Sequence, residues 1–195
     1  MIARRARPVL CLAIAAVLLA GCGAGTGSGN NRSSTAAAEV NGTPVSLALY
    51  TRLVKAEQHR AESTGVHIDW SKKPGADQLK SIQRDVLSTL VRETVVEQLA
   101  TAKHLSLSQA ELEGGITRIE KALGGPAAFD DQLAKDGLSR GDFQVLFRAR
   151  LLESKLNRAD PAFAADLRAA LQAAKVQAYV GPCQARHGYS DCIKT

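Results

Sequence analysis

Residues 37–54, AAEVNGTPVSLALYTRLV, combine a short extended segment, a tight turn and the start of a helix. The Asn41-Gly42 pair is typical of a turn, and Ser46 is a good N-cap for the apolar-periodic residues that follow it. A lone strand would leave its backbone groups without hydrogen-bond partners. The extended segment therefore needs a partner strand elsewhere in the chain.

That partner is predicted at the far end of the sequence. The period of the apolar residues changes at Lys175, where Val176, Ala178 and Val180 alternate with polar neighbours in AKVQAYV. We expect the two segments to pair with each other and to join the two ends of one domain.

Between the two strands, the apolar residues recur at helical spacing. Capping residues, glycines and prolines divide this region into helices that are expected from Ser46, over 77–103, from Ser108 to Gly124, around Phe129 and Leu133, from Ser139 or Asp142 to about Arg158, and from Pro161 onward. The predicted fold is mostly α, with about six helices and a small two-stranded sheet pairing the N- and C-terminal strands. Gly114 and Gly115 each cost about 1 kcal/mol of helix propensity, so the third helix depends on tertiary packing.

The fifth helix carries two apolar rows, and they have two explanations. One row holds Phe143, Leu146, Phe147 and Leu151, and the other holds Val145, Ala149, Leu152 and Leu156. Either the helix is central and buried on both sides, or one row stays partly exposed and contacts apolar partners. Under the second explanation, the candidate client-binding residues are Val145, Leu152 and Leu156, together with Val91 and Val95 of the second helix.

The N-terminus predicts export and lipid anchoring. A basic segment with Arg4, Arg5 and Arg7 precedes an apolar run that is too short to span a bilayer. The sequence LAGC, which ends at Cys22, resembles a bacterial lipobox, in which the cysteine receives the lipid. An ordinary secretory signal is the alternative. We expect a lipoprotein signal peptide over 1–21, a flexible tether over 22–37, a helical domain over 38–181 and a C-terminal tail over 182–195.

Charge and cysteine content point to the same compartment. The chain has 25 basic and 19 acidic residues, and 22 basic residues remain once the signal is removed. These charges are scattered, whereas a nucleic-acid-binding protein would carry a clustered basic stripe. Cys183 and Cys192 are expected to form a disulfide outside the cytoplasm. A metal site of Cys183, His187 and Cys192 is the alternative, although a fourth ligand and a recognised spacing are missing.

The sequence carries none of the local motifs that mark common catalytic or phosphate-binding sites. We therefore expect no catalytic residues, no cofactor and no metal, although sites assembled from distant residues leave no such motif.

Several segments resemble the N-terminal chaperone module of the SurA/PrsA group of bacterial envelope foldases. They are EVNGTPVSLALYTRLV, LKSIQRDVLSTLVRETVVEQLATAKHLSLSQAELE, FDDQLAKDGLSRGDFQVLFRARLLESKL and LRAALQAAKVQAYV, in this order over about residues 38–180. Members that are isomerases carry a parvulin domain between the fifth and last helices. Here Leu156 is followed directly by NRADPAFAADL, which leads into the last helix and leaves no room for a parvulin domain.

The resemblance implies binding of unfolded or partly folded secreted polypeptides without catalysis; residual prolyl isomerase activity is not expected. With the lipobox, it predicts a chaperone-like lipoprotein that is extracytoplasmic and held at the cell membrane through Cys22. The alternative is a dedicated interaction or assembly lipoprotein that binds one specific envelope partner. A nucleic-acid partner is not expected.

Overall fold

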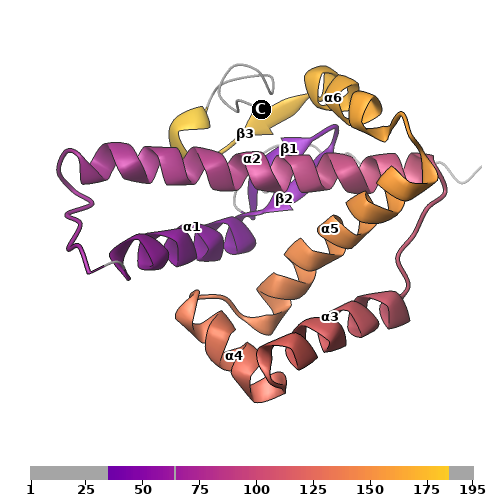
Figure 1. Ribbon diagram of the computed structural model, residues 1–195. Coiled ribbons are helices and arrows are strands. Elements are labelled where there is room, and N and C mark those ends of the chain that lie inside the picture. The colour runs from indigo at the N-terminus through magenta and orange to yellow at the C-terminus, as the bar shows by residue number, and fades with distance from the viewer. Residues whose placement is uncertain (1–34, 64, 185–195) are drawn as a thin grey trace, which may run out of the picture.

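A three-stranded antiparallel sheet joins the two ends of the domain. The computed structural model describes residues 35–63 and 65–184. Within them, β1 (Ala36–Val40) lies between β2 (Thr43–Ser46) and β3 (Val176–Ala178), as Figure 1 shows. Val40 is opposite Val176 and Ala38 is opposite Ala178. The predicted pairing of these distant segments is confirmed.

The sheet has three strands where two were predicted. Asn41 and Gly42 both have positive φ angles, as a two-residue hairpin turn requires. The chain therefore folds back, and β2 pairs with β1 in the register Val40 to Thr43. Pro44 lies on β2, which is an edge strand, where its missing N–H costs no ladder hydrogen bond.

The turn itself is tied to two other parts of the chain. The Asn41 backbone N–H donates to the Lys175 carbonyl, and the Lys175 N–H donates to the Asn41 side-chain oxygen, both at 2.9 Å. Gln98 accepts a hydrogen bond from the Asn41 amide and donates one to the Val40 carbonyl, at 2.8 and 3.0 Å. Asn41 therefore fixes both the start of β3 and the position of the long helix that carries Gln98.

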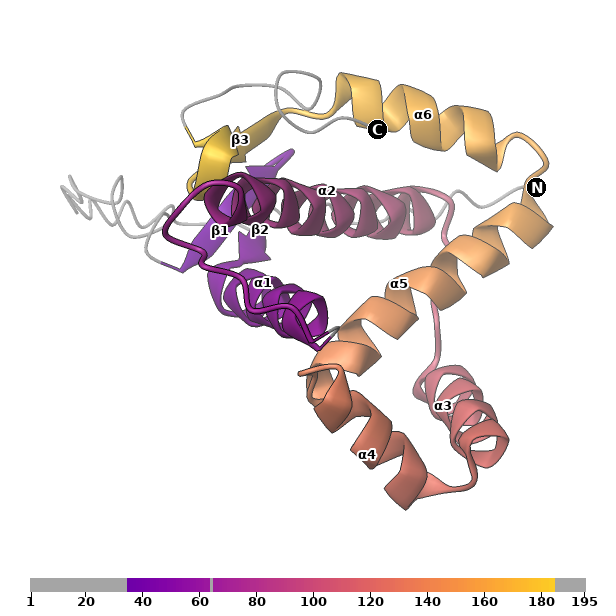
Figure 2. The same cartoon turned by 60° about the vertical axis from the view of Figure 1, so that its left-hand side comes forward.

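Six α-helices lie between β2 and β3 in the described residues, in agreement with the predicted number. They are α1 (Leu47–Glu62), α2 (Gly75–Ala102), α3 (Gln109–Leu123), α4 (Pro126–Lys135), α5 (Arg140–Ala159) and α6 (Phe163–Ala173), and a 3-10 helix η1 (Gly181–Cys183) follows β3. The long α2 packs against the sheet, α1, α5 and α6. α3 and α4 pack on each other and on α5, and stand apart from the sheet and α6 (Figures 1 and 2).

Three of the predicted helix starts, at Ser46, Ser108 and Ser139, have side-chain caps. The helix expected from Pro161 begins instead at Phe163, without a side-chain cap. Ser108 and Glu111 form the expected capping box of α3, and Ser139 and Asp142 form a second one at the start of α5. α3 ends at Gly124, whose φ of 99° is the left-handed conformation of a helix C-cap.

The structure corrects the choice between the two apolar rows of α5. Leu152 and Leu156 are 3% and 0% exposed, and Val91 and Val95 of α2 are 0% and 2% exposed. These four candidate client-binding residues belong to the core where α2 packs against α5, so they have no surface to offer a partner. Of the five candidates, Val145 alone is exposed, at 47%. The row that stays partly exposed is the other one: Phe143, Leu146, Phe147 and Leu151.

The two adjacent glycines of α3 have different surroundings. A Cβ atom on Gly115 would lie 2.7 Å from Cε1 of Phe147 and 3.2 Å from Cδ1 of Leu151, whereas one on Gly114 would meet nothing within 4 Å. Gly115 therefore permits the close packing of α3 on α5, and Gly114 has no such role.

This difference predicts opposite effects of the same substitution at neighbouring positions. Gly115→Ala should lower the free energy of unfolding by about 1–2 kcal/mol, because the overpacking outweighs the gain in helix propensity. Gly114→Ala should raise it by up to about 1 kcal/mol. Urea unfolding of the two variants measures both values, and equal effects would contradict this description of the α3–α5 contact.

Candidate functional site

A cleft of about 430 Å³ lies between α1, α2 and α5; we call it the α1–α5 cleft. Its apolar lining includes Leu53, Ile82, Val86, Leu138 and Leu146, and its charged lining includes Glu57, Arg60, Asp85, Glu93 and Arg150. Leu146 comes from the partly exposed row of α5. The lining is therefore mixed, with apolar and charged side chains in similar numbers, and it offers a ligand both apolar surface and hydrogen-bonding groups.

The cleft has a defined shape because the start of α5 is bonded to α1. Asp142 is 3% exposed and accepts hydrogen bonds from Arg52 of α1 at 2.8 and 2.9 Å and from the Ser139 hydroxyl at 2.6 Å. Burial disfavours the charged carboxylate, but the hydrogen bonds from Arg52 and Ser139 outweigh it, so the pKa of Asp142 lies below its ordinary value. The α4–α5 turn also approaches α1 closely, since a Cβ on Gly137 would lie 3.3 Å from the Ala56 Cα.

Glu93 is the residue lining the cleft whose pKa is shifted. Burial raises its pKa to about 7; the nearby charges of Arg150 and Arg92 oppose this rise and that of Glu97 adds to it. A carboxyl group with this pKa is partly protonated near neutral pH, so it can both donate and accept hydrogen bonds to a bound chain. A strongly shifted carboxyl in a cleft is a common mark of a functional site.

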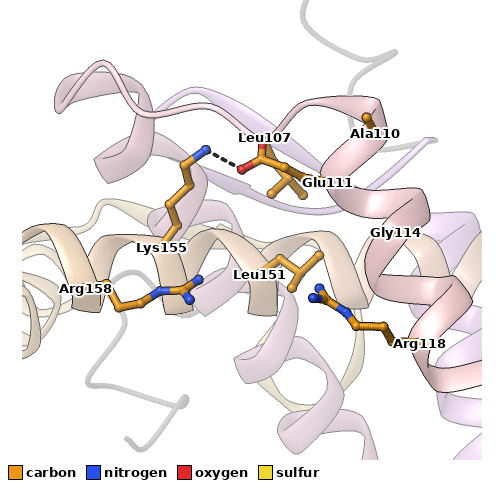
Figure 3. A pocket seen from close by; sticks show the side chains of 8 residues that line it. All are labelled: Leu107, Ala110, Glu111, Gly114, Arg118, Leu151, Lys155 and Arg158. Atoms are coloured by element: carbon orange, nitrogen blue, oxygen red, sulfur yellow. Dashed lines mark hydrogen bonds and ion pairs between the residues drawn. The ribbon is translucent and has the colours of Figure 1, made fainter. Parts of the chain in front are cut away.

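A second concave surface, about 300 Å³ in volume, lies on the other side of α5, against α3; we call it the α3–α5 groove. Its lining residues are Leu107, Ala110, Glu111, Gly114, Arg118, Leu151, Lys155 and Arg158 (Figure 3). Lys155 donates to Glu111 at 2.7 Å and to the Ser106 carbonyl at 2.8 Å. The hydrogen bond from Lys155, with those from the Ser108 hydroxyl and backbone, lowers the pKa of Glu111 to about 2.

The remaining predicted site residues are only partly within the described chain. Cys183 is 1% exposed and disulfide-bonded. Its predicted partner Cys192 and the predicted lipidation site Cys22 lie outside the described residues, so that pairing and the lipidation stay predictions. Among residues 35–63 and 65–184, no group of three or more His, Cys, Asp or Glu side chains could hold a metal ion.

Sequence reasoning did not find the groups that line the two concave surfaces. Leu146 belongs to the row of α5 that supplied none of the candidate client-binding residues, and nothing in the sequence sets Arg118 and Arg158 apart from the other scattered charges. Glu93 carries no clear signal either, because Arg92 and Glu97 place further charges in the same stretch of α2.

None of the helices that the structure describes is long and apolar enough to cross a membrane. A family model described as "SurA-like N-terminal domain" matches residues 4–157, which is more than three quarters of the chain. The match ends within α5, so α6 and β3 lie beyond it. No curated protein and no solved structure matches the chain.

Proposed function

The chain belongs to the family of SurA-like N-terminal domains, and on that premise we propose that it is a chaperone-like protein that binds unfolded or partly folded polypeptides outside the cytoplasm. In this proposal it acts without catalysis and is anchored to the membrane by lipid on Cys22. The lipobox-like LAGC sequence supports the lipid anchor, and the extracytoplasmic location of the family supports the proposed compartment.

The observation that carries this proposal is the α1–α5 cleft, into which Leu146 of the partly exposed row of α5 projects apolar surface. An unfolded polypeptide offers apolar side chains on a polar backbone. Ile82, Leu138 and Leu146 provide apolar surface for the side chains, and the charged residues at the cleft provide hydrogen-bonding groups for the backbone. A surface of this mixed kind binds many sequences weakly, as a chaperone requires.

The direct test is suppression of client aggregation. The full chain, held in nanodiscs of phosphatidylcholine, should reduce the light scattering of citrate synthase diluted from denaturant, compared with empty nanodiscs. Leu146→Asn should weaken this suppression because it removes apolar surface from the cleft. Leu123→Asn is the matched control: Leu123 is an exposed leucine, at 45%, but lines neither the α1–α5 cleft nor the α3–α5 groove, so suppression should be unchanged.

Absence of suppression at several-fold molar excess would overturn the chaperone proposal. Capture of one stoichiometric partner from the envelope, in place of many clients, would then favour the dedicated assembly lipoprotein. A proline-isomerisation assay should give no catalysis above the uncatalysed rate.

A further inference from the structure

The α3–α5 groove carries two positive charges that the rest of the described chain leaves unpaired. Lys155 is neutralised locally by Glu111. Arg118 forms no ion pair with any described residue, and Arg158 donates only to the Ser154 carbonyl of its own helix, at 3.2 Å. In Figure 3, both guanidinium groups flank Leu151, on which the apolar floor of the groove is centred.

Gly114 opens the same groove from the α3 side. A glycine inside a helix costs about 1 kcal/mol relative to alanine, and no packing contact accounts for it here, since a Cβ would meet nothing within 4 Å. At the neighbouring position 115, in contrast, the close approach of Phe147 and Leu151 explains why the residue is a glycine. The bare backbone at Gly114 leaves room for another chain to approach the helix closely.

We propose that the α3–α5 groove binds acidic segments of client polypeptides in which a carboxylate lies next to an apolar side chain. The carboxylate binds Arg118 and Arg158, the apolar side chain lies on Ala110 and Leu151, and the client backbone passes over Gly114. Guanidinium groups favour carboxylates because they donate paired hydrogen bonds in a fixed plane. This inference rests on the proposed function, and it names the class of segment that the chaperone prefers.

The undescribed parts of the chain offer little acidic sequence to the groove. Residues 1–34 contain no Asp or Glu, and residues 185–195 contain Asp191 as their single acidic side chain. The apolar floor at Leu151 also favours a peptide over a lipid phosphate, which brings no side chain to cover it. The occupant with matching chemistry is therefore another polypeptide.

The test is peptide binding by fluorescence anisotropy, with the full chain in phosphatidylcholine nanodiscs. A short labelled peptide that alternates Leu and Glu should bind at least about tenfold more tightly than the same peptide with Gln in place of Glu, since each lost charged hydrogen bond is worth about one such factor. Raising the salt concentration should reduce this preference because the groove is open to solvent.

Three variants locate the binding in the groove. Arg118→Glu combined with Arg158→Glu should abolish the preference and create one for a Leu-Lys peptide, a gain that an unfolded variant could not show. Arg168→Glu, an exposed position on α6, is the control and should leave the preference intact. Gly114→Ala should weaken binding severalfold while the fold becomes more stable, because the added methyl group obstructs the client backbone.

The outcomes separate this inference from the proposed function. If the protein suppresses aggregation but binds the Glu and Gln peptides equally, the inference is wrong and the chaperone function stands. If it does neither, both are wrong. The double variant can also be compared with the wild type for binding to separate nanodiscs that contain anionic phosphatidylglycerol. If it loses that binding but binds the peptides as the wild type does, the groove recognises lipid and the peptide proposal is overturned.

Discussion

Val40→Asp is expected to unfold the whole domain and not merely to fray its ends. Val40 is 0% exposed in the central strand β1, opposite Val176 of β3. An Asp at this position would place an unpaired charge in the core, which costs on the order of 3–5 kcal/mol or more. Because total domain stability is typically about 5–15 kcal/mol, the loss should appear in circular dichroism as one cooperative transition at much lower temperature.

The control places a charge on the exposed side of the same sheet. Gln177 is exposed on β3 and lies opposite Glu39, so Gln177→Lys should change the free energy of unfolding by less than about 0.5 kcal/mol. Val176→Asp should reproduce the effect of Val40→Asp, since Val176 is 4% exposed. If the core variants lost only signal from the chain ends and kept the main transition, the sheet would not be what closes the domain.

The pairing of β1 with β3 could be predicted because both segments show an alternating or extended pattern and no other partner strand was predicted for either. The third strand could not be predicted in the same way. Residues 43–46 are only four long and contain Pro44, so they read as part of the turn although Asn41-Gly42 is a strong hairpin signal. Hairpin pairing with β1 overrides that weak local preference.

The two rows of α5 show where sequence reasoning ends. Both have the same helical period, so periodicity alone cannot tell which row is buried in the core. The decision comes from the neighbours of α5: α2 and α6 pack against this helix, Leu152 and Leu156 are buried in the core, and Leu146 lines the α1–α5 cleft. The candidate site is equally non-local, because its walls come from three helices that are separated in the sequence. The caps at Ser46, Ser108 and Ser139, in contrast, depend on residues three apart and were predicted correctly.

The Glu93 side chain should make the domain less stable as the pH rises through neutrality. Its pKa is about 7 in the folded protein and about 4.5 in an ordinary environment. Between these values the folded state binds more protons than the unfolded state, so stability is greatest towards pH 4.5 and falls as the pH rises to about 8. The loss should be on the order of 3 kcal/mol, since the shift is about 2.5 pKa units and one unit corresponds to about 1.4 kcal/mol.

Glu93→Gln isolates this effect because the amide cannot ionise. The variant should be more stable than the wild type at about pH 8 and should lose most of the dependence of the melting temperature on pH between about 5 and 8. Glu113→Gln, at an exposed position on α3, is the control and should follow the wild-type curve. The groups whose pKa values are lowered in the fold, including Asp142 and Glu153, act in the opposite direction, and their contribution is lost only at more acidic pH. A wild-type stability that stayed flat over this range would show that Glu93 is well hydrated, and the α1–α5 cleft would then be more open to water than its apolar lining indicates.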